Sequence, residues 1–333
     1  MSKIEVLAPG LLTTVQDLGR EGFGPMGVSP SGAADPIALR IGNRLLGNAE
    51  GAAGLEMTLL GGTFQFQGAC VVALTGSDFG ATLEDAPVVQ WASLEAKPGQ
   101  TLRLGPTRSG ARCYLCVRGG IGVKPFLGSA STHLLSGLGG HEGRALRKGD
   151  VLKVGGSVDT SRTGTFACFS KALRQLAPRK VLRVTPGPQS DWFPKAARES
   201  FYASAYRVTE EANRMGLRLE GPLLPEGAQG KAFGEMISEG VSLGAIQIAA
   251  GGSPIILFVE QQTTGGYAKI ANVISADLGS LGQLRPRDEI RFTPVSFATA
   301  RKLLIEQEKL LASKDLISED QKVRERRRAG GAA

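Results

Sequence analysis

Amide, hydroxyl and phenol side chains gather in one stretch of the chain, between residues 235 and 292. These groups donate and accept hydrogen bonds without carrying charge, and the paired glycines within the stretch let backbone N–H groups approach a ligand closely. We therefore expect the stretch to bind a small polar substrate. The candidate substrate-binding residues here are Gln247, Gln262, Thr263, Thr264, Gly265 and Gly266.

Two further residues of this stretch have side chains suited to catalysis. Lys269 could hold an oxyanion or a phosphate, and Tyr267 could donate a hydrogen bond to a developing charge. The alternative is purely structural, because Gly265-Gly266 could be a hairpin turn between strands at 255–259 and 268–274. The residues alone leave both interpretations open.

A second polar cluster surrounds a glycine-rich turn near the N-terminus. Asp17 and Arg20 precede the turn, and Ser31 follows it. Because non-repetitive polar loops often carry function, Asp17 and Arg20 are candidate catalytic residues and Ser31 is a candidate substrate contact. Alternatively, Asp17 and Arg20 form an ion pair that holds a structural turn.

A third cluster, from 213 to 220, alternates arginines with apolar residues. If Arg214 and Arg218 occupy one extended strand, their side chains share a face, and two guanidinium groups there would read an anion. Asn213 joins them as a candidate substrate-binding residue. The alternative is that both arginines lie on the surface above a buried apolar face.

Elements that could position these groups are short and mostly extended. Apolar runs of four to seven residues alternate with turns supplied by 46 glycines, which show no fixed period. Helices are expected near 35–46, after Asp191, and from Ser296 onward, where a cap residue precedes an apolar pattern of helical spacing. The sequence predicts a mainly β protein with a few short helices and a C-terminal helix.

Domain boundaries follow from length and composition. A chain of 333 residues is long for one core, and a Gly-, Ser- and Pro-containing stretch around 155–180 resembles a linker. We expect an N-terminal β domain over 1–178, a C-terminal β-barrel domain over 179–298, and a helix with a basic, frayed tail over 299–333.

Several classes of function are disfavoured by composition. The net charge of +8 is spread along the chain, and the basic cluster at 324–328 lacks aromatic residues for stacking bases, so no nucleic-acid role is expected. There is no apolar run long enough to cross a bilayer and no N-terminal export signal, which predicts a cytoplasmic protein without membrane contact. Four cysteines form no disulfide framework, and two histidines without partners of ligand spacing give no metal site.

Spaced motifs recur along the chain from about residue 4 to 293. They are Gln16–Arg20, Ser31–Asp35, Leu46–Asn48, Gly119–Ile121, Gly128–Thr132, Gly139–Arg144, Arg214–Gly221, Gly244–Gln247, Gln262–Tyr267 and Gln283–Pro286. Together these motifs resemble the biotin-dependent carboxyltransferase family, which includes the C subunit of bacterial 5-oxoprolinase, an antagonist of a sporulation-kinase inhibitor, and allophanate hydrolase subunit 2.

The resemblance implies two cyclophilin-like β-barrel units and one part of a multi-subunit enzyme. Partners would be a paralogous B subunit, of the kinase-inhibitor type, and an A subunit, of the LamB/YcsF type. Such a complex opens the lactam of 5-oxoproline to glutamate and uses ATP, whose site is not located in this chain. The chain would be inactive alone.

Other family activities remain open as alternatives. The chain could be the carboxyltransferase part of a urea carboxylase or allophanate hydrolase system, or a non-enzymatic antagonist of a kinase inhibitor. No biotin-attachment sequence of the Ala-Met-Lys-Met type occurs here, so biotin would have to arrive on another polypeptide. For an enzyme subunit, the resemblance therefore implies a small amide or lactam as substrate without fixing which one.

Overall fold

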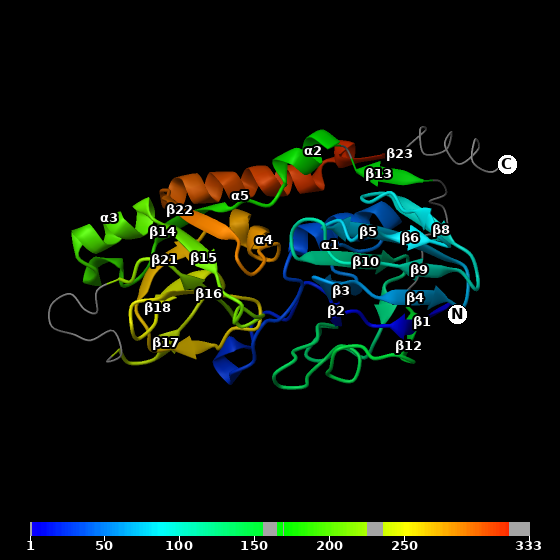
Figure 1. Cartoon of the computed structure of the whole chain (residues 1–333), viewed down its shortest axis with the longest axis horizontal. Helices are drawn as coiled ribbons and strands as arrows, with labels where there is room; N and C mark the ends of the chain where they lie inside the picture. The colour runs from blue at the N-terminus through cyan, green and yellow to red at the C-terminus, as the bar shows by residue number, and fades with distance from the viewer. Residues whose placement is uncertain (1, 156–164, 169, 225–235, 320–333) are drawn as a thin grey trace. The chain divides into compact units, whose positions relative to one another are not determined.

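The computed structural model describes residues 2–155, 165–168, 170–224 and 236–319 (Figure 1). The chain divides into two compact units, and each is assembled from separate stretches of sequence. Residues 20–34, expected in the N-terminal domain, are grouped with the second unit, whereas residues from 309 onward are grouped with the first. The basic cluster at 324–328 lies outside the described residues. Unit 1 consists of Met1–Gly19, Asp35–Ala177 and Lys309–Ala333, and unit 2 of Arg20–Ala34 and Pro178–Glu308.

Unit 1 is built mainly from two antiparallel sheets. The larger has the order β11(Ile121–Gly122), β12(Val151–Val154), β1(Lys3–Ala8), β4(Thr63–Phe66), β9(Thr101–Arg103), β6(Thr82–Leu83), β7(Ala86–Pro87). The smaller has the order β2(Leu12–Gln16), β3(Gly54–Thr58), β10(Arg112–Val117), β5(Cys70–Gly76), β8(Ser93–Ala96). A separate pair joins β13(Phe166–Cys168) to β23(Ile317–Glu319). Short segments complete the unit: α2(Ser170–Gln175) and η4(Lys314–Leu316).

Helix α1(Pro36–Leu46) of unit 1 confirms the helix expected near 35–46. Asp35 caps it, because its carboxylate accepts a hydrogen bond from the backbone N–H of Ala38 at 3.1 Å. Pro36 occupies the first helical position, where no N–H is needed. Gly47 ends the helix with a φ of 73°, a backbone conformation that glycine adopts at little cost.

The cysteines of strand β10 are packing residues. Cys113 lies in the apolar core of unit 1, whereas Cys116 is buried on the side of α1, where its Sγ lies 3.8 Å from the carbonyl oxygen of Leu39. Both thiols are free. Burial raises the pKa of Cys116 to about 12, so it stays protonated and unreactive.

Unit 2 is a closed barrel (Figure 1). Its strands follow the order β14(Val181–Pro186), β21(Lys269–Val273), β18(Ala245–Ile248), β19(Pro254–Leu257), β16(Gly216–Glu220), β15(Ala205–Val208), β22(Glu289–Pro294). The pair that closes it, β14 and β22, is parallel, whereas the other pairs are antiparallel. A two-stranded ribbon, β17(Glu239–Gly240) with β20(Thr264–Gly265), lies outside the barrel ladder.

The barrel interior follows from alternation along its strands. Leu217 and Leu219 of β16, Ile246 and Ile248 of β18, and Ile256 of β19 all belong to one buried apolar cluster. Because successive side chains of a strand point to opposite faces, the residues between them face outward. The mainly β class with few short helices is thus confirmed, and the polar candidates of β16 and β18 lie on the outer face of the barrel.

Helices of unit 2 are short except for α5(Phe297–Ala312), which the pattern after Ser296 predicted and whose last four residues are grouped with unit 1. The helix expected after Asp191 is divided into a 3-10 turn, η2(Ser190–Trp192), and a helix, α3(Lys195–Ala203). The division occurs because Phe193, the residue before Pro194, is extended, and Pro194 itself occupies the N-cap position of α3. Among the described residues, no helix combines the length and apolarity needed to cross a membrane. The remaining short segments are η1(Gly24–Met26), η3(Ser275–Asp277) and α4(Leu278–Leu281).

Candidate functional site

A row of side chains crosses the outer face of the unit 2 barrel. Arg218 of β16 is paired directly with Ile255 of β19, and Ile255 is paired with Gln247 of β18. Gln247 is in turn paired with Lys269 of β21, next to an irregularity in the register. Since directly paired residues share a face, the register aligns a cation, an apolar side chain, an amide and a second cation.

A polar segment covers one end of this row. Residues 261–267 run over β18 and β21, held by the backbone hydrogen bond from Val241 N–H to the Thr263 carbonyl at 3.1 Å and by the pairing of β17 with β20. Gln247 is consequently only 1% exposed and Lys269 only 2% exposed, although both lie on the outer face. The segment therefore acts as a cover over the barrel wall.

The hairpin alternative for Gly265-Gly266 is not what the structure contains. Strand β19 pairs with β16 and β18, and β21 pairs with β14 and β18, so no ladder joins β19 to β21. Gly265 instead belongs to β20, and a Cβ at this position would lie 2.6 Å from Gln247 Nε2. A side chain at this position would displace the Gln247 amide, because the cover passes directly over it.

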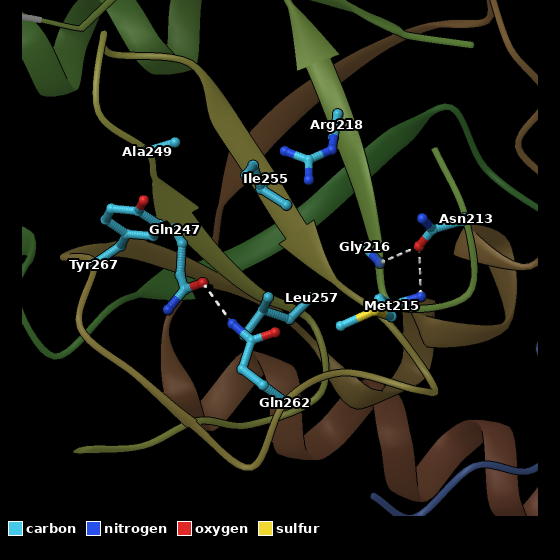
Figure 2. Close-up of a pocket in the computed structure, with 10 residues that line it drawn as sticks. All are labelled: Asn213, Met215, Gly216, Arg218, Gln247, Ala249, Ile255, Leu257, Gln262 and Tyr267. Carbon is cyan, nitrogen blue, oxygen red and sulfur yellow. Dashed lines mark hydrogen bonds between the residues drawn. The ribbon is translucent and has the colours of Figure 1, made fainter. Parts of the chain in front are cut away.

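Beside the cover lies a cavity of about 240 Å³, shown in Figure 2. Its volume falls below the roughly 300–1,000 Å³ of pockets for drug-sized ligands, so it suits a small molecule. Asn213 shapes one edge, because its Oδ1 accepts hydrogen bonds from the backbone N–H groups of Met215 at 2.8 Å and Gly216 at 3.3 Å. The lining residues are Asn213, Met215, Gly216, Arg218, Gln247, Ala249, Ile255, Leu257, Gln262 and Tyr267.

Two glutamines meet at this cavity. Gln262 Nε2 of the cover donates to Gln247 Oε1 of β18 at 3.3 Å (Figure 2). Gln247 Nε2 is buried and has no hydrogen-bond partner within the described part of the chain. A buried amide donor without a partner is costly, which makes this N–H₂ group a ready donor for a ligand.

Lys269 lies in an electrostatic cluster next to the cavity. Its Nζ forms an ion pair with Glu239 Oε1 at 2.8 Å, and Gln189 Nε2 donates to the same oxygen at 2.9 Å. The hydrogen bond from Lys269, with that from Gln189, lowers the pKa of Glu239. Gln189 also accepts from the Lys269 backbone N–H at 3.2 Å. The carboxylate of Glu239 thus holds the ammonium group in place from the β17 side.

The two arginines expected to share a face do not. Strand β16 begins at Gly216, so Arg214 precedes it and turns inward, where it forms a buried ion pair with Glu260 and donates to the Gly32 carbonyl at 2.7 Å. Arg218 instead lies on the outer face with a half-exposed side chain. Arg214 is therefore structural, and of the two arginines only Arg218 lines this cavity and can bind an anion there.

Segment 20–34 is anchored to the unit 2 barrel. The Arg20 backbone N–H donates to the Pro30 carbonyl at 2.8 Å, and Ser29 Oγ donates to the Val259 carbonyl at 3.2 Å. The side chains of Arg20 and Ser31 are buried, and Ser31 adopts a φ of 54°. Neither residue lines the cavity of Figure 2.

Asp17 lies in unit 1 and organises a loop there. Its carboxylate accepts hydrogen bonds from Ser129 Oγ at 2.6 Å, Ser131 Oγ at 2.5 Å and the Ala130 backbone N–H at 2.6 Å. The Gly19 N–H adds a fourth at 2.8 Å. These four hydrogen bonds hold the carboxylate in the loop, so a structural role accounts for Asp17.

Glu239, Gln189 and Glu260 were not singled out from the sequence. Each lies many positions from its partner: Glu239 is 30 residues before Lys269, and Glu260 is 46 residues after Arg214. No local motif surrounds Glu239 or Gln189. Within the described chain, no group of three or more His, Cys, Asp or Glu side chains is placed to hold a metal ion.

The chain matches the family model of the carboxyltransferase domain, subdomains A and B, over residues 26–294. That span covers most of the sequence, including the barrel, the cavity and its cover. The chain belongs to this carboxyltransferase-domain family. Members of similar length include the C subunit of 5-oxoprolinase from Escherichia coli, which is 39% identical over 92% of this chain and 96% of its own length.

Other members of the carboxyltransferase-domain family are larger proteins. Urea amidolyase of Saccharomyces cerevisiae is 35% identical over 94% of this chain, but the match covers 18% of the yeast protein. The crystal structure of Kluyveromyces lactis urea amidolyase superimposes with a TM-score of 0.86 at 34% identity, over 95% of this chain and 21% of that one. The fold found here thus also occurs as one part of a much longer polypeptide.

Proposed function

We propose that this chain is the C subunit of an ATP-dependent 5-oxoprolinase-type complex, which opens the lactam of 5-oxoproline to L-glutamate. The observation that carries the proposal is the near full-length match to the Escherichia coli protein of that name. A protein from Haemophilus influenzae with the same name is 37% identical over 94% of its length. The identities of 37–39% to the two 5-oxoprolinase subunits, against 32–35% to the urea-metabolising enzymes, favour the 5-oxoprolinase type.

The candidate site supports this proposal chemically. A lactam is a stabilised amide, and its oxygen must carry negative charge before the ring can open. Donors without charge, such as Gln247 Nε2 and the Tyr267 hydroxyl, would bind that oxygen, while Lys269 would stabilise a developing anion nearby. Gln262 of the cover, which lines the cavity, would enclose the ring and exclude water, and Thr263, Thr264 and Gly266 of the same segment are proposed as further contacts outside the present lining.

Other parts of the machinery lie on partner chains in this proposal. A LamB/YcsF-type A subunit, together with a paralogous B subunit, would complete the complex, and the chain would be inactive alone. ATP would be used by the complex, without a site assigned to this chain. Arg20 and Asp17 are still proposed to take part in catalysis, and Ser31 in substrate binding. The Asp17 carboxylate, however, already accepts hydrogen bonds from four donors in unit 1.

A urea carboxylase role is the second candidate, because the urea amidolyase and urea carboxylase relatives share 32–35% identity with this chain. In that case, the chain would act on urea with biotin delivered by another polypeptide. The two candidates differ in substrate, so one assay separates them.

Reconstitution tests the proposal directly. The purified chain is mixed with candidate B and A subunits, and glutamate formed from 5-oxoproline is measured with and without ATP. We expect ATP-dependent glutamate formation that disappears when this chain is left out. The same rate without the chain, or consumption of urea and not of 5-oxoproline, would remove 5-oxoprolinase activity from consideration.

A further inference from the structure

The cavity of unit 2 has different chemistry at its two ends. Arg218 lies at one end and Gln247 at the other, with Ile255 directly between them on the intervening strand (Figure 2). Neighbouring strands are about 4.8 Å apart, so the two polar residues originate roughly 10 Å from each other, and their side chains shorten that gap. A ligand that bridges them must be small and must carry two different polar groups.

The Gln247 end fits a neutral oxygen acceptor. Gln262 already donates to Gln247 Oε1, which fixes the amide and leaves its buried Nε2 without a hydrogen-bond partner among the described residues. Since this donor is buried, an acceptor that reaches it gains a hydrogen bond shielded from water. An amide or lactam carbonyl meets this requirement without bringing a charge into the buried end.

The Arg218 end fits an anion. Its guanidinium has a loose ion pair with Glu211 at 3.7 Å, and the Glu211 side chain is 80% exposed. Such a pair contributes little stability and can be exchanged for a ligand carboxylate, which a guanidinium binds through two parallel hydrogen bonds. Ile255 and Leu257 supply an apolar surface for the carbon skeleton between the two ends.

We propose that this cavity selects small amides that carry a carboxylate, with Arg218 binding the carboxylate and Gln247 Nε2 binding the amide oxygen. The inference rests on the proposed function and deepens it, because 5-oxoproline has both groups. Urea has the amide but no carboxylate. Arg218 is therefore the residue that distinguishes the lactam acid from neutral amides.

Direct binding tests this selection without any need for turnover. The full chain is titrated calorimetrically with 5-oxoproline, with 2-pyrrolidinone, which is the same lactam without the carboxylate, and with urea. We expect 5-oxoproline to bind at least about tenfold more tightly than 2-pyrrolidinone, which corresponds to the gain of one charge-assisted interaction. Urea should bind no better than 2-pyrrolidinone.

Substitutions test whether Arg218 causes the preference for 5-oxoproline over 2-pyrrolidinone. Arg218→Gln should remove the advantage of 5-oxoproline and leave binding of 2-pyrrolidinone unchanged, whereas Arg218→Lys should keep part of it. Arg207→Gln is the matched control, because Arg207 is an exposed arginine on the adjacent strand β15 and does not line the cavity. Gln247→Leu should weaken the binding of both lactams, since the buried Nε2 donor would bind the lactam oxygen of each.

Three results of the binding titrations would overturn the inference: no binding of either lactam, equal binding of both, or a carboxylate preference that survives in Arg218→Gln. Failure of the proposed function looks different. A complex that forms no glutamate while the chain keeps an Arg218-dependent preference would reject the function and leave the inference standing. A complex that forms glutamate with an unchanged KM for 5-oxoproline in Arg218→Gln would reject the inference and leave the proposed function standing.

Discussion

Lys269 shows how a single candidate residue changes meaning once its neighbours are known. A lysine in a glycine-rich polar segment suggests a free cation that awaits an anion. In the fold its ammonium group is buried and already paired with Glu239, which is itself half-exposed. Any role in charge stabilisation must therefore involve Glu239, either by sharing the ammonium group or by releasing it to the substrate.

Lys269→Met tests that role, because methionine keeps most of the length of the side chain but removes its charge. We expect turnover in the reconstituted complex to be lost while assembly of the complex is unchanged, since Glu239 can be solvated in the absence of its partner. Lys180→Met is the control, because Lys180 also forms a close ion pair, at 2.7 Å with Asp288, but, unlike Lys269, it is not paired with a residue that lines the cavity. Wild-type turnover by Lys269→Met would leave Lys269 with a structural role only.

At the scale of elements, one buried ion pair ties three segments of unit 2 together. Arg214 precedes β16, Glu260 follows β19, and the Arg214 guanidinium also donates to the Gly32 carbonyl in segment 20–34. The Glu260 backbone N–H donates to the Arg214 carbonyl at 2.8 Å as well. The pair therefore fixes the strand ends from which the cavity wall and its cover emerge.

Removal of one partner of this pair should be strongly destabilising. Glu260→Gln leaves Arg214 buried without its counter-charge, for which a loss of about 3 kcal/mol in the free energy of unfolding is expected. Urea denaturation of the purified chain provides the measurement. Glu210→Gln is the control, because it breaks the exposed pair with Arg287 and should change stability little. Equal effects of the two substitutions would contradict the assignment.

At the scale of the whole molecule, each unit has its own apolar core and its own tryptophan. Trp91 belongs to unit 1 and Trp192 to unit 2, so fluorescence can follow the units separately. Unit 1 also contains an ion pair that affects the titration of an aspartate. In unit 1, two hydrogen bonds from Arg144, at 2.8 and 3.0 Å, lower the pKa of Asp150 to about 2.

This lowered pKa predicts an acid-sensitive contribution to the stability of unit 1. An aspartate in the unfolded chain titrates near pH ~3.9, so the contribution is present above about pH 4 and is lost as the pH falls through about 2. In a Trp192→Phe background, Asp150→Asn should lower the urea midpoint reported by Trp91 at about pH 6. The difference between the two proteins should shrink at about pH 2. A difference independent of pH would contradict the Arg144 linkage.

Much of the fold and part of the site could be predicted from local sequence. Asp35-Pro36 and Gly47 specified both ends of helix α1, because capping depends on neighbours in the chain. The alternation of arginines with apolar residues at 213–220 set Arg218 opposite a buried apolar face in one interpretation, and strand β16 has that arrangement. Local sequence could not show that Arg214 would turn inward, since its partner Glu260 lies 46 residues away.

The sequence by itself determined the family, the mainly β class and the polar stretch that supplies Gln247 and Gln262. Only the tertiary structure decided which of its groups act together. Strand register placed Arg218, Ile255 and Gln247 in one row, and the cover buried Gln247 and Lys269 on what would otherwise be an exposed wall. Register and burial arise from contacts between residues distant in the chain, so spacing along the sequence could not reveal them.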